Sequence, residues 1–120
     1  MIDTLIGEIE PVVDGELARA QKEHGDSFHT PHEAYAVLRE EIEELRDEVD
    51  SIIDELLLKD ERQYGSLWEQ TKTFDPSQIA CVKLLECAYK DTFMAAMRAA
   101  AEAMQVAAVA KKALDSMEIW

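Results

Sequence analysis

The sequence is poor in basic residues, cysteine, glycine and proline. Lysine and arginine number 12 against 26 aspartates and glutamates, which gives a formal net charge of -14. Direct binding to nucleic acid depends on cations that neutralise phosphates, so a chain without a basic patch is not expected to bind it. The chain has 120 residues but only 4 glycines and 3 prolines. The length predicts a single domain over residues 1–120.

The cysteines, the N-terminus and the apolar segments argue against a zinc-binding, a secreted or a membrane protein. Cys81 and Cys87 are the 2 cysteines, and their spacing is not that of a zinc site, so we expect two half-buried thiols in a reducing compartment. Met1–Asp3 shows no basic segment of the kind that opens a signal peptide. The one long apolar run, Phe93–Ala110, is mostly alanine and carries charges, which favours a buried helix over a membrane span. A soluble cytoplasmic protein without membrane contact is expected.

The alternation of apolar and polar residues that is typical of β-strands is also missing. Helical periodicity is present instead, most clearly in His32–Val49. Thr30 is suited to cap this helix, Pro31 suits its first position, and Glu33 completes a capping box with Thr30. We expect the helix to end near Leu58. Its apolar stripe consists of Ala34, Leu38, Ile42, Leu45, Val49, Ile52 and Leu56.

Two segments flank this central helix. Ile2–His24 reads as helical, with Pro11 predicting a kink or a division into two pieces and Gly25 predicting the end. Lys59–Asp75 is polar and is predicted to be a loop, with at most a helical turn. Its aromatic residues, among them Trp68, would either pin the loop to the core or cover a site, and pinning is the preferred interpretation.

A last helix is predicted from Asp75-Pro76 to about Met117, with a break allowed by its length. In its second half every face becomes apolar, which predicts that the segment is covered on more than one side, and a second subunit is an obvious cover. The fold class is therefore all-α, an antiparallel bundle of three to five helices. The stripe predicted to be buried consists of Ile79, Val82, Tyr89, Phe93, Ala96, Ala100, Met104 and Ala107.

Acidic residues on two of these helices share one spacing. Glu41 and Glu44 lie three residues apart at the edge of the central stripe, and Glu102 and Gln105 repeat that spacing in the most apolar part of the chain. Two facing helices with such pairs could surround a divalent cation with oxygen ligands, and oxygen ligation favours Mg²⁺ or Mn²⁺ over zinc. A solvated acidic face, or pairing of Glu102 with Arg98, remains the simpler alternative.

These residues carry a resemblance. The segment Glu40–Leu45, reading EEIEEL, resembles the EExxEL motif of the MazG-like all-α nucleoside triphosphate pyrophosphohydrolases. His32–Tyr35 and Glu102–Ala108 resemble a short branch of that family common among phage and prophage proteins. The resemblance extends from about Ser27 to Ala108. It implies a metal-dependent enzyme that cleaves a nucleoside triphosphate between the α- and β-phosphates, giving a monophosphate and pyrophosphate.

The resemblance also implies site residues. Glu41 and Glu44 would be the first pair of Mg²⁺ ligands, and Glu102 would open the second. Gln105 stands where the family has aspartate, and a neutral amide is a weaker ligand. Glu44 or Glu48 would orient the attacking water.

The cations nearest in sequence to the second motif are Arg98, Lys111 and Lys112. Any of them could contact phosphate, although an Arg98–Glu102 pair and solvated lysines are the preferred interpretation. Arg98 and Lys111, together with His32 at the helix start, are the predicted substrate-binding residues. A homodimer or homotetramer is expected. A non-catalytic helical protein that binds a nucleotide or a protein partner, and a plain structural bundle without metal, remain alternatives.

Overall fold

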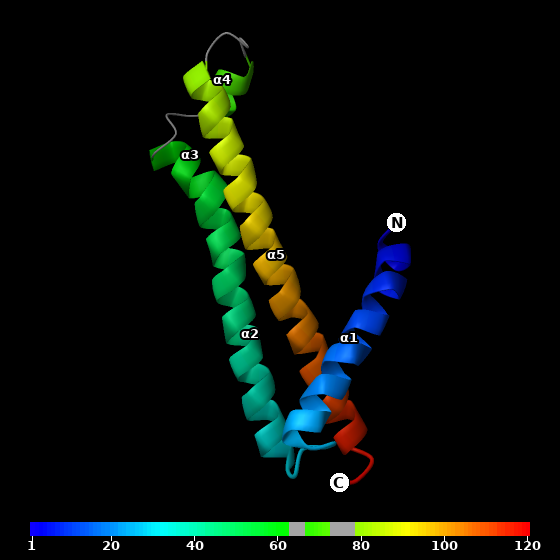
Figure 1. The fold of residues 1–120 in the computed structure, drawn as a ribbon. Coiled ribbons are helices and arrows are strands. Elements are labelled where there is room, and N and C mark those ends of the chain that lie inside the picture. Colours follow the sequence, from blue (N-terminus) through cyan, green and yellow to red (C-terminus); the bar gives the residue numbers. More distant parts are fainter. Residues whose placement is uncertain (63–66, 73–78) are drawn as a thin grey trace. The chain divides into compact units, whose positions relative to one another are not determined.

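The computed structural model describes residues 1–62, 67–72 and 79–120 (Figure 1). Within these ranges the chain is helical and contains no strand, which confirms the all-α class. The elements are α1 (Ile2–His24), α2 (Pro31–Ile53), the π-helical segment η1 (Asp54–Leu58), α3 (Lys59–Arg62), α4 (Leu67–Lys72) and α5 (Ile79–Ser116).

The chain divides into two compact units. The terminal unit comprises Met1–Arg46 and Ala100–Trp120, and the central unit comprises Asp47–Ala99. The two long helices, α2 and α5, each contribute to both units. The prediction of a single domain stays a prediction, and each unit is described by itself.

The start of α2 confirms the predicted cap. Thr30 Oγ1 accepts a hydrogen bond from the Glu33 backbone N–H at 3.1 Å, and α2 begins at Pro31. Such a bond satisfies one of the backbone donors that a helix leaves free in its first turn. The cap therefore fixes where α2 begins, and with it the side of the helix on which each acidic residue of α2 lies.

The helix α1 runs without interruption through Pro11, so the predicted division into two pieces is wrong. Gly25 ends the helix as predicted. Its φ of 93° lies in the region that side chains disfavour, and its N–H donates to the Gln21 carbonyl at 2.9 Å.

The predicted loop after α2 is largely helical. Helicity continues through η1 and α3 to Arg62 and resumes in α4. Asp60 explains the restart, because its carboxylate accepts hydrogen bonds from the backbone N–H groups of Leu67 and Trp68 at the start of α4. Leu67 is buried, whereas Trp68 is 69% exposed, so the prediction that Trp68 pins this segment to the core is wrong. Phe74 and the predicted cap at Asp75-Pro76 lie outside the described residues.

The helix α5 is unbroken over 38 residues. Its buried line differs from the predicted stripe, since Tyr89 and Phe93 are each 63% exposed. Small side chains allow close approach of neighbouring helices, so burial along α5 follows small size more than apolar character. Over residues 82–116 of α5, the buried apolar residues are Ala88, Ala95, Ala99 and Ala108.

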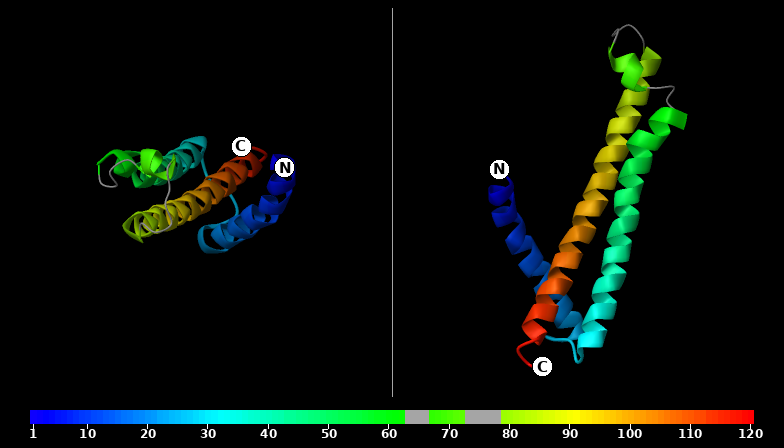
Figure 2. Two further views of the ribbon diagram at one scale, coloured as in Figure 1. Left: turned by 90° about the horizontal axis from the view of Figure 1, so that it is seen from above. Right: turned by 180° about the vertical axis from the view of Figure 1, so that it is seen from behind.

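In the terminal unit, the C-terminal half of α1 and the first part of α2 lie beside the end of α5 (Figures 1 and 2). The Phe28 backbone N–H donates to Ser116 Oγ at 2.9 Å, and Trp120 Nε1 donates to the Phe28 carbonyl at 3.2 Å. Ser116 is fully buried. These bonds tie the loop between α1 and α2 to the C-terminal end of the chain.

Part of α5, Val82–Ser116, is long and apolar enough to cross a membrane by length and composition. Arg98, Glu102 and Gln105 interrupt it, and charged groups in the middle of a span are costly. The predicted location in the cytoplasm stays a prediction.

Candidate metal centre

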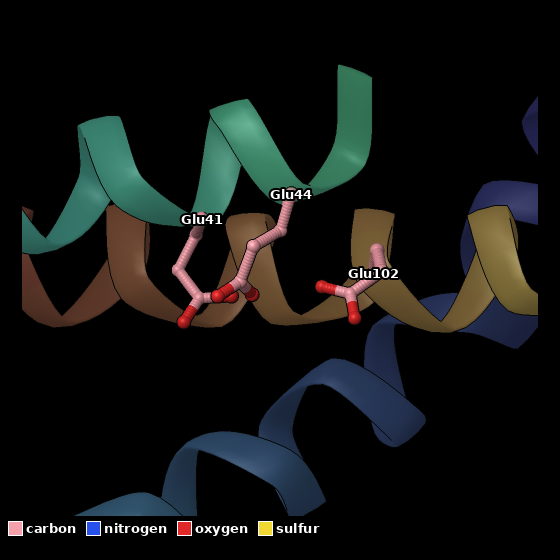
Figure 3. A group of neighbouring side chains, drawn as sticks. All are labelled: Glu41, Glu44 and Glu102. Carbon is pink, nitrogen blue, oxygen red and sulfur yellow. The ribbon is translucent and has the colours of Figure 1, made fainter. Parts of the chain in front are cut away.

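Three glutamates from two helices of the terminal unit point toward one another (Figure 3). Glu41 and Glu44 come from α2, and Glu102 comes from α5. One carboxylate oxygen from each lies within 4.8 Å of the others. The structure therefore brings together residues that the sequence placed on two separate helices.

The helical spacing explains this arrangement. Residues three apart on a helix project from the same side, so Glu41 and Glu44 act as a pair on α2. Glu102 and Gln105 have the same relation on α5. The three glutamates face one another where the helices lie side by side (Figure 3), and Gln105 lies within hydrogen-bond distance of Glu41 and Glu102. Glu41, Glu102 and Gln105 are half-buried, whereas Glu44 is exposed.

Gln105 lies against two of these carboxylates. With its amide nitrogen toward them, it donates hydrogen bonds to Glu102 Oε2 at 3.2 Å and to Glu41 Oε2 at 3.3 Å. With its amide oxygen toward them, acceptors would face acceptors, and only a cation among them would make that arrangement favourable. Gln105 can thus serve a cluster with a metal and a cluster without one by turning its amide.

The electrostatics of the cluster centre on Glu41. Burial raises the pKa of its carboxyl above the ordinary value, and the nearby charges of Glu44, Glu102 and Glu40 raise it further. Like charges close together disfavour ionisation, whereas an opposite charge would favour it. The protein without metal therefore holds unfavourable negative charge at this point.

The donor set fits a hard divalent cation. Three carboxylates and one amide offer only oxygen ligands, which suit Mg²⁺ or Mn²⁺. The observation behind this fit is the approach of one oxygen from each of the three carboxylates to within 4.8 Å of the others. A bound ion would offset the repulsion that raises the pKa of Glu41.

A cavity of about 190 Å³ adjoins the cluster. Its lining includes Glu41 and Gln105 of the cluster, together with Phe28, Lys112 and the ion pair of Arg19 with Glu16. Ligand sites commonly occupy about 300–1,000 Å³, so this cavity can hold only part of a nucleotide. The cluster is therefore connected to a space that combines cationic and aromatic side chains.

The other predicted catalytic residue, Glu48, lies in the central unit. Its Oε2 accepts from Arg98 Nε at 3.4 Å. The structure thus gives Arg98 a partner that the spacing of the later motif did not suggest. Glu48 is not part of the carboxylate cluster, which consists of Glu41, Glu44 and Glu102.

The remaining predicted substrate contacts are on the surface. Lys111 forms an ion pair with Asp14 of α1, which raises the pKa of the lysine. His32 is exposed in the first turn of α2. Lys112, in contrast, is only 6% exposed, so its interpretation as a solvated lysine is wrong. Lys112 follows Gln105 by about two helical turns. This spacing is the sequence signal that indicates that the two residues lie on the same side of α5.

The comparison with family models matches the HalX domain over residues 18–67, which is fewer than half of the 120 residues. The matched segment contains Glu41 and Glu44 but ends before Glu102 and Gln105. No curated protein and no solved structure matches the chain.

This finding corrects the predicted resemblance to the MazG-like pyrophosphohydrolases. The family match is to the HalX domain and not to a MazG family, so the resemblance, and the phage-type branch with it, is wrong. An EExxEL segment is a short pattern in a chain with 26 acidic residues, and such patterns arise on many acidic helices. What the chain does must therefore be argued from the residues of the cluster.

Proposed function

We propose that Glu41, Glu44, Glu102 and Gln105 bind Mg²⁺ or Mn²⁺, and that the protein uses this ion to bind and hydrolyse a nucleoside triphosphate to a monophosphate and pyrophosphate. The observation that carries the proposal is the approach of three carboxylate oxygens to within 4.8 Å of one another. Such an arrangement repels itself unless protons or a cation compensate.

The choice of a phosphate substrate follows from charge. A chain with a net charge of -14 repels anions, and a divalent ion held by acidic residues is the usual way to bind phosphate in such surroundings. When bound, the ion would offset the charge on phosphate oxygens. The neighbouring cavity adds Lys112 as a cation and Phe28 as an aromatic surface, whereas its other cation, Arg19, is paired with Glu16, which also lines the cavity.

In this proposal, some residues of the cluster bind the ion and another accepts a proton. Glu41 and Glu102, both half-buried, would hold the ion, and Gln105 would turn its amide oxygen toward it. Glu44 is the more exposed carboxylate and would accept a proton from an attacking water. Glu48 is paired with Arg98, which makes it a weaker candidate for this role.

The test is a hydrolysis assay over a panel of nucleoside triphosphates with Mg²⁺ and with Mn²⁺. Pyrophosphate and orthophosphate are measured together, because their ratio shows which bond is cleaved. We expect pyrophosphate release that Glu44→Gln abolishes and Glu43→Gln leaves intact. Glu43 is a matched control because it is exposed on the same helix and pairs with Arg39. Absence of turnover with every nucleotide and both metals would overturn the enzymatic proposal.

A second candidate function is metal-dependent nucleotide binding without hydrolysis. Gln105 favours it, because a neutral amide contributes less to holding a hard cation than a carboxylate does. Calorimetry with Mg²⁺ and a non-hydrolysable nucleotide would then show binding, while the hydrolysis assay shows no product. Turnover in Gln105→Asp but not in the wild-type protein would identify this position as the cause.

We also propose that the protein works as a homodimer or homotetramer. Phe93, Met94 and Met97 on α5 are more than half exposed, and monomeric proteins rarely leave large contiguous apolar surfaces uncovered. The cavity beside the cluster is also small for a whole nucleotide. Light scattering at micromolar concentration should give a multiple of 13.6 kDa, and a monomer mass would overturn this part of the proposal.

A further inference from the structure

Lys112 is a buried lysine with no acidic partner among the residues that the structure describes. It is 6% exposed, and within the described ranges no ion pair or hydrogen bond joins its ammonium to another side chain. The contact that its ammonium does make is with the ring of Phe28, with Nζ 4.4 Å from the ring centroid. Buried charges in proteins are normally paired, so this ammonium lacks the counter-charge that its burial requires.

The surroundings of Lys112 indicate where that counter-charge would come from. Lys112 lines the same cavity as Glu41 and Gln105, two residues of the candidate metal centre. Phe28, in turn, is held in place by its backbone bond to Ser116. The ammonium is therefore fixed on an aromatic ring and borders a space that also opens to the cluster.

We propose that Lys112 is the anion-binding residue of this cavity, and that its ammonium binds a phosphate oxygen of the polyphosphate chain whose cation is held by Glu41, Glu44 and Glu102. This inference rests on the proposed function. A phosphate group placed there is the counter-ion of Lys112 and a ligand of the cation at once. A lysine ammonium binds phosphate as a compact point charge. It therefore needs no second donor held in a fixed geometry beside it.

Of the two adjacent lysines, only Lys112 is suited to bind an anion in the cavity, and the contacts of Lys111 show why. It is the adjacent residue, but it is about half exposed and forms an ion pair with Asp14. Consecutive residues of a helix point about 100° apart, so the two lysines face different surroundings. Lys111 thus provides a control of equal charge next to the proposed site.

The experiment compares wild-type protein with Lys112→Met and Lys111→Met by calorimetry. Each is titrated first with Mg²⁺ alone and then, at saturating Mg²⁺, with inorganic tripolyphosphate and with α,β-methylene-ATP. We expect unchanged Mg²⁺ affinity in all three proteins. We expect Lys112→Met to lose at least about tenfold in affinity for both phosphate probes, the scale of one charge-assisted contact, and Lys111→Met to change little.

The outcomes separate this inference from the function on which it rests. If wild-type protein does not bind Mg²⁺, the proposed metal centre fails and the inference fails with it. If Mg²⁺ binds but Lys112→Met retains wild-type affinity for both probes, the inference alone is overturned. A loss for the nucleotide analogue but not for tripolyphosphate also overturns it, because the contact would then be with the nucleoside.

A second measurement avoids the risk that Lys112→Met does not fold. Wild-type protein is treated with an amine-reactive reagent in the presence of Mg²⁺, with and without tripolyphosphate, and modified lysines are identified by mass spectrometry. Tripolyphosphate should protect Lys112 and leave Lys111 as reactive as before. Equal modification of Lys112 under both conditions would overturn the inference.

Discussion

The side-chain amide of Gln105 contacts the Glu41 carboxylate across the two long helices, 3.3 Å from Oε2 when the amide nitrogen faces it. The same nitrogen reaches Glu102 Oε2 at 3.2 Å. A single neutral residue therefore bridges the acids of α2 and α5. These hydrogen bonds stabilise the cluster in the absence of metal, and in the proposed metal centre the same amide would turn its oxygen toward the ion.

Removing charge from Glu41 should stabilise the metal-free protein. Like charges at this spacing on a helix destabilise by about 0.2–0.5 kcal/mol, and Glu41→Gln removes such a pair with Glu44. The same variant should lose the stabilisation by Mg²⁺, which amounts to about 2.7 kcal/mol at a concentration of 100 times the dissociation constant. Urea unfolding with and without Mg²⁺ measures both effects. A plain structural bundle predicts the first effect and no Mg²⁺ effect in either protein.

The raised pKa of Glu41 predicts a dependence of stability on pH. Above the ordinary glutamate pKa of about 4.3, the folded protein retains on Glu41 a proton that the unfolded chain has released. Stability rises with pH only where the unfolded state binds more protons, so here it falls as pH rises through the raised pKa. The difference in unfolding free energy between wild type and Glu41→Gln isolates this contribution. A difference that is constant across this range, without metal, would contradict the assignment.

Adding a charge at position 105 should have the opposite effects with and without metal. Gln105→Glu places a fourth carboxylate in the cluster, so we expect lower stability without metal. We expect Mg²⁺ affinity to rise by about tenfold, or about 1.4 kcal/mol, because ligand charge tunes affinity for hard cations. Calorimetry and thermal unfolding of the same samples measure both. Lower Mg²⁺ affinity in this variant would show that Gln105 does not face the ion.

The hydroxyl of Ser116 should be important for the terminal unit. Ser116→Ala leaves the Phe28 backbone N–H without its acceptor in a buried position, and an unsatisfied buried donor costs about 1–3 kcal/mol. Ser116 Oγ also donates to the Lys112 carbonyl one turn earlier, at 2.8 Å. Ser51→Ala is the matched control, because Ser51 Oγ makes the same kind of bond to the Asp47 carbonyl but lies near the surface. The control should change unfolding free energy by no more than about 0.5 kcal/mol. Equal effects of both variants would contradict the role of this bond.

The sequence predicted the elements whose signals are local. The cap at Thr30 and the stop at Gly25 depend on side chains and dihedral angles within a few residues, and both were predicted. The pair Glu41 and Glu44 was predicted to face Glu102 from helical spacing alone, because two amphipathic helices offer few ways to place half-buried acids.

The features that depend on contacts between distant residues were missed. Nothing local shows that Asp60 would cap a helix starting at Leu67 or that Ser116 would bind the backbone of Phe28. The burial of Lys112 was missed for the same reason, since a lysine near the end of a helix is usually solvated. The buried line of α5 follows its alanines, whose small size is a signal only once the neighbouring helix is known.

The most direct test of the metal centre is a Mg²⁺ titration by calorimetry of wild type, Glu102→Gln and Glu43→Gln. Glu102 is one of the three clustered acids, and Glu43 is an exposed acid of α2 paired with Arg39. We predict saturable binding by wild type and Glu43→Gln, and a loss of at least about tenfold in affinity for Glu102→Gln. Equal affinity in all three proteins, or no binding by any of them, would contradict a metal centre at this cluster.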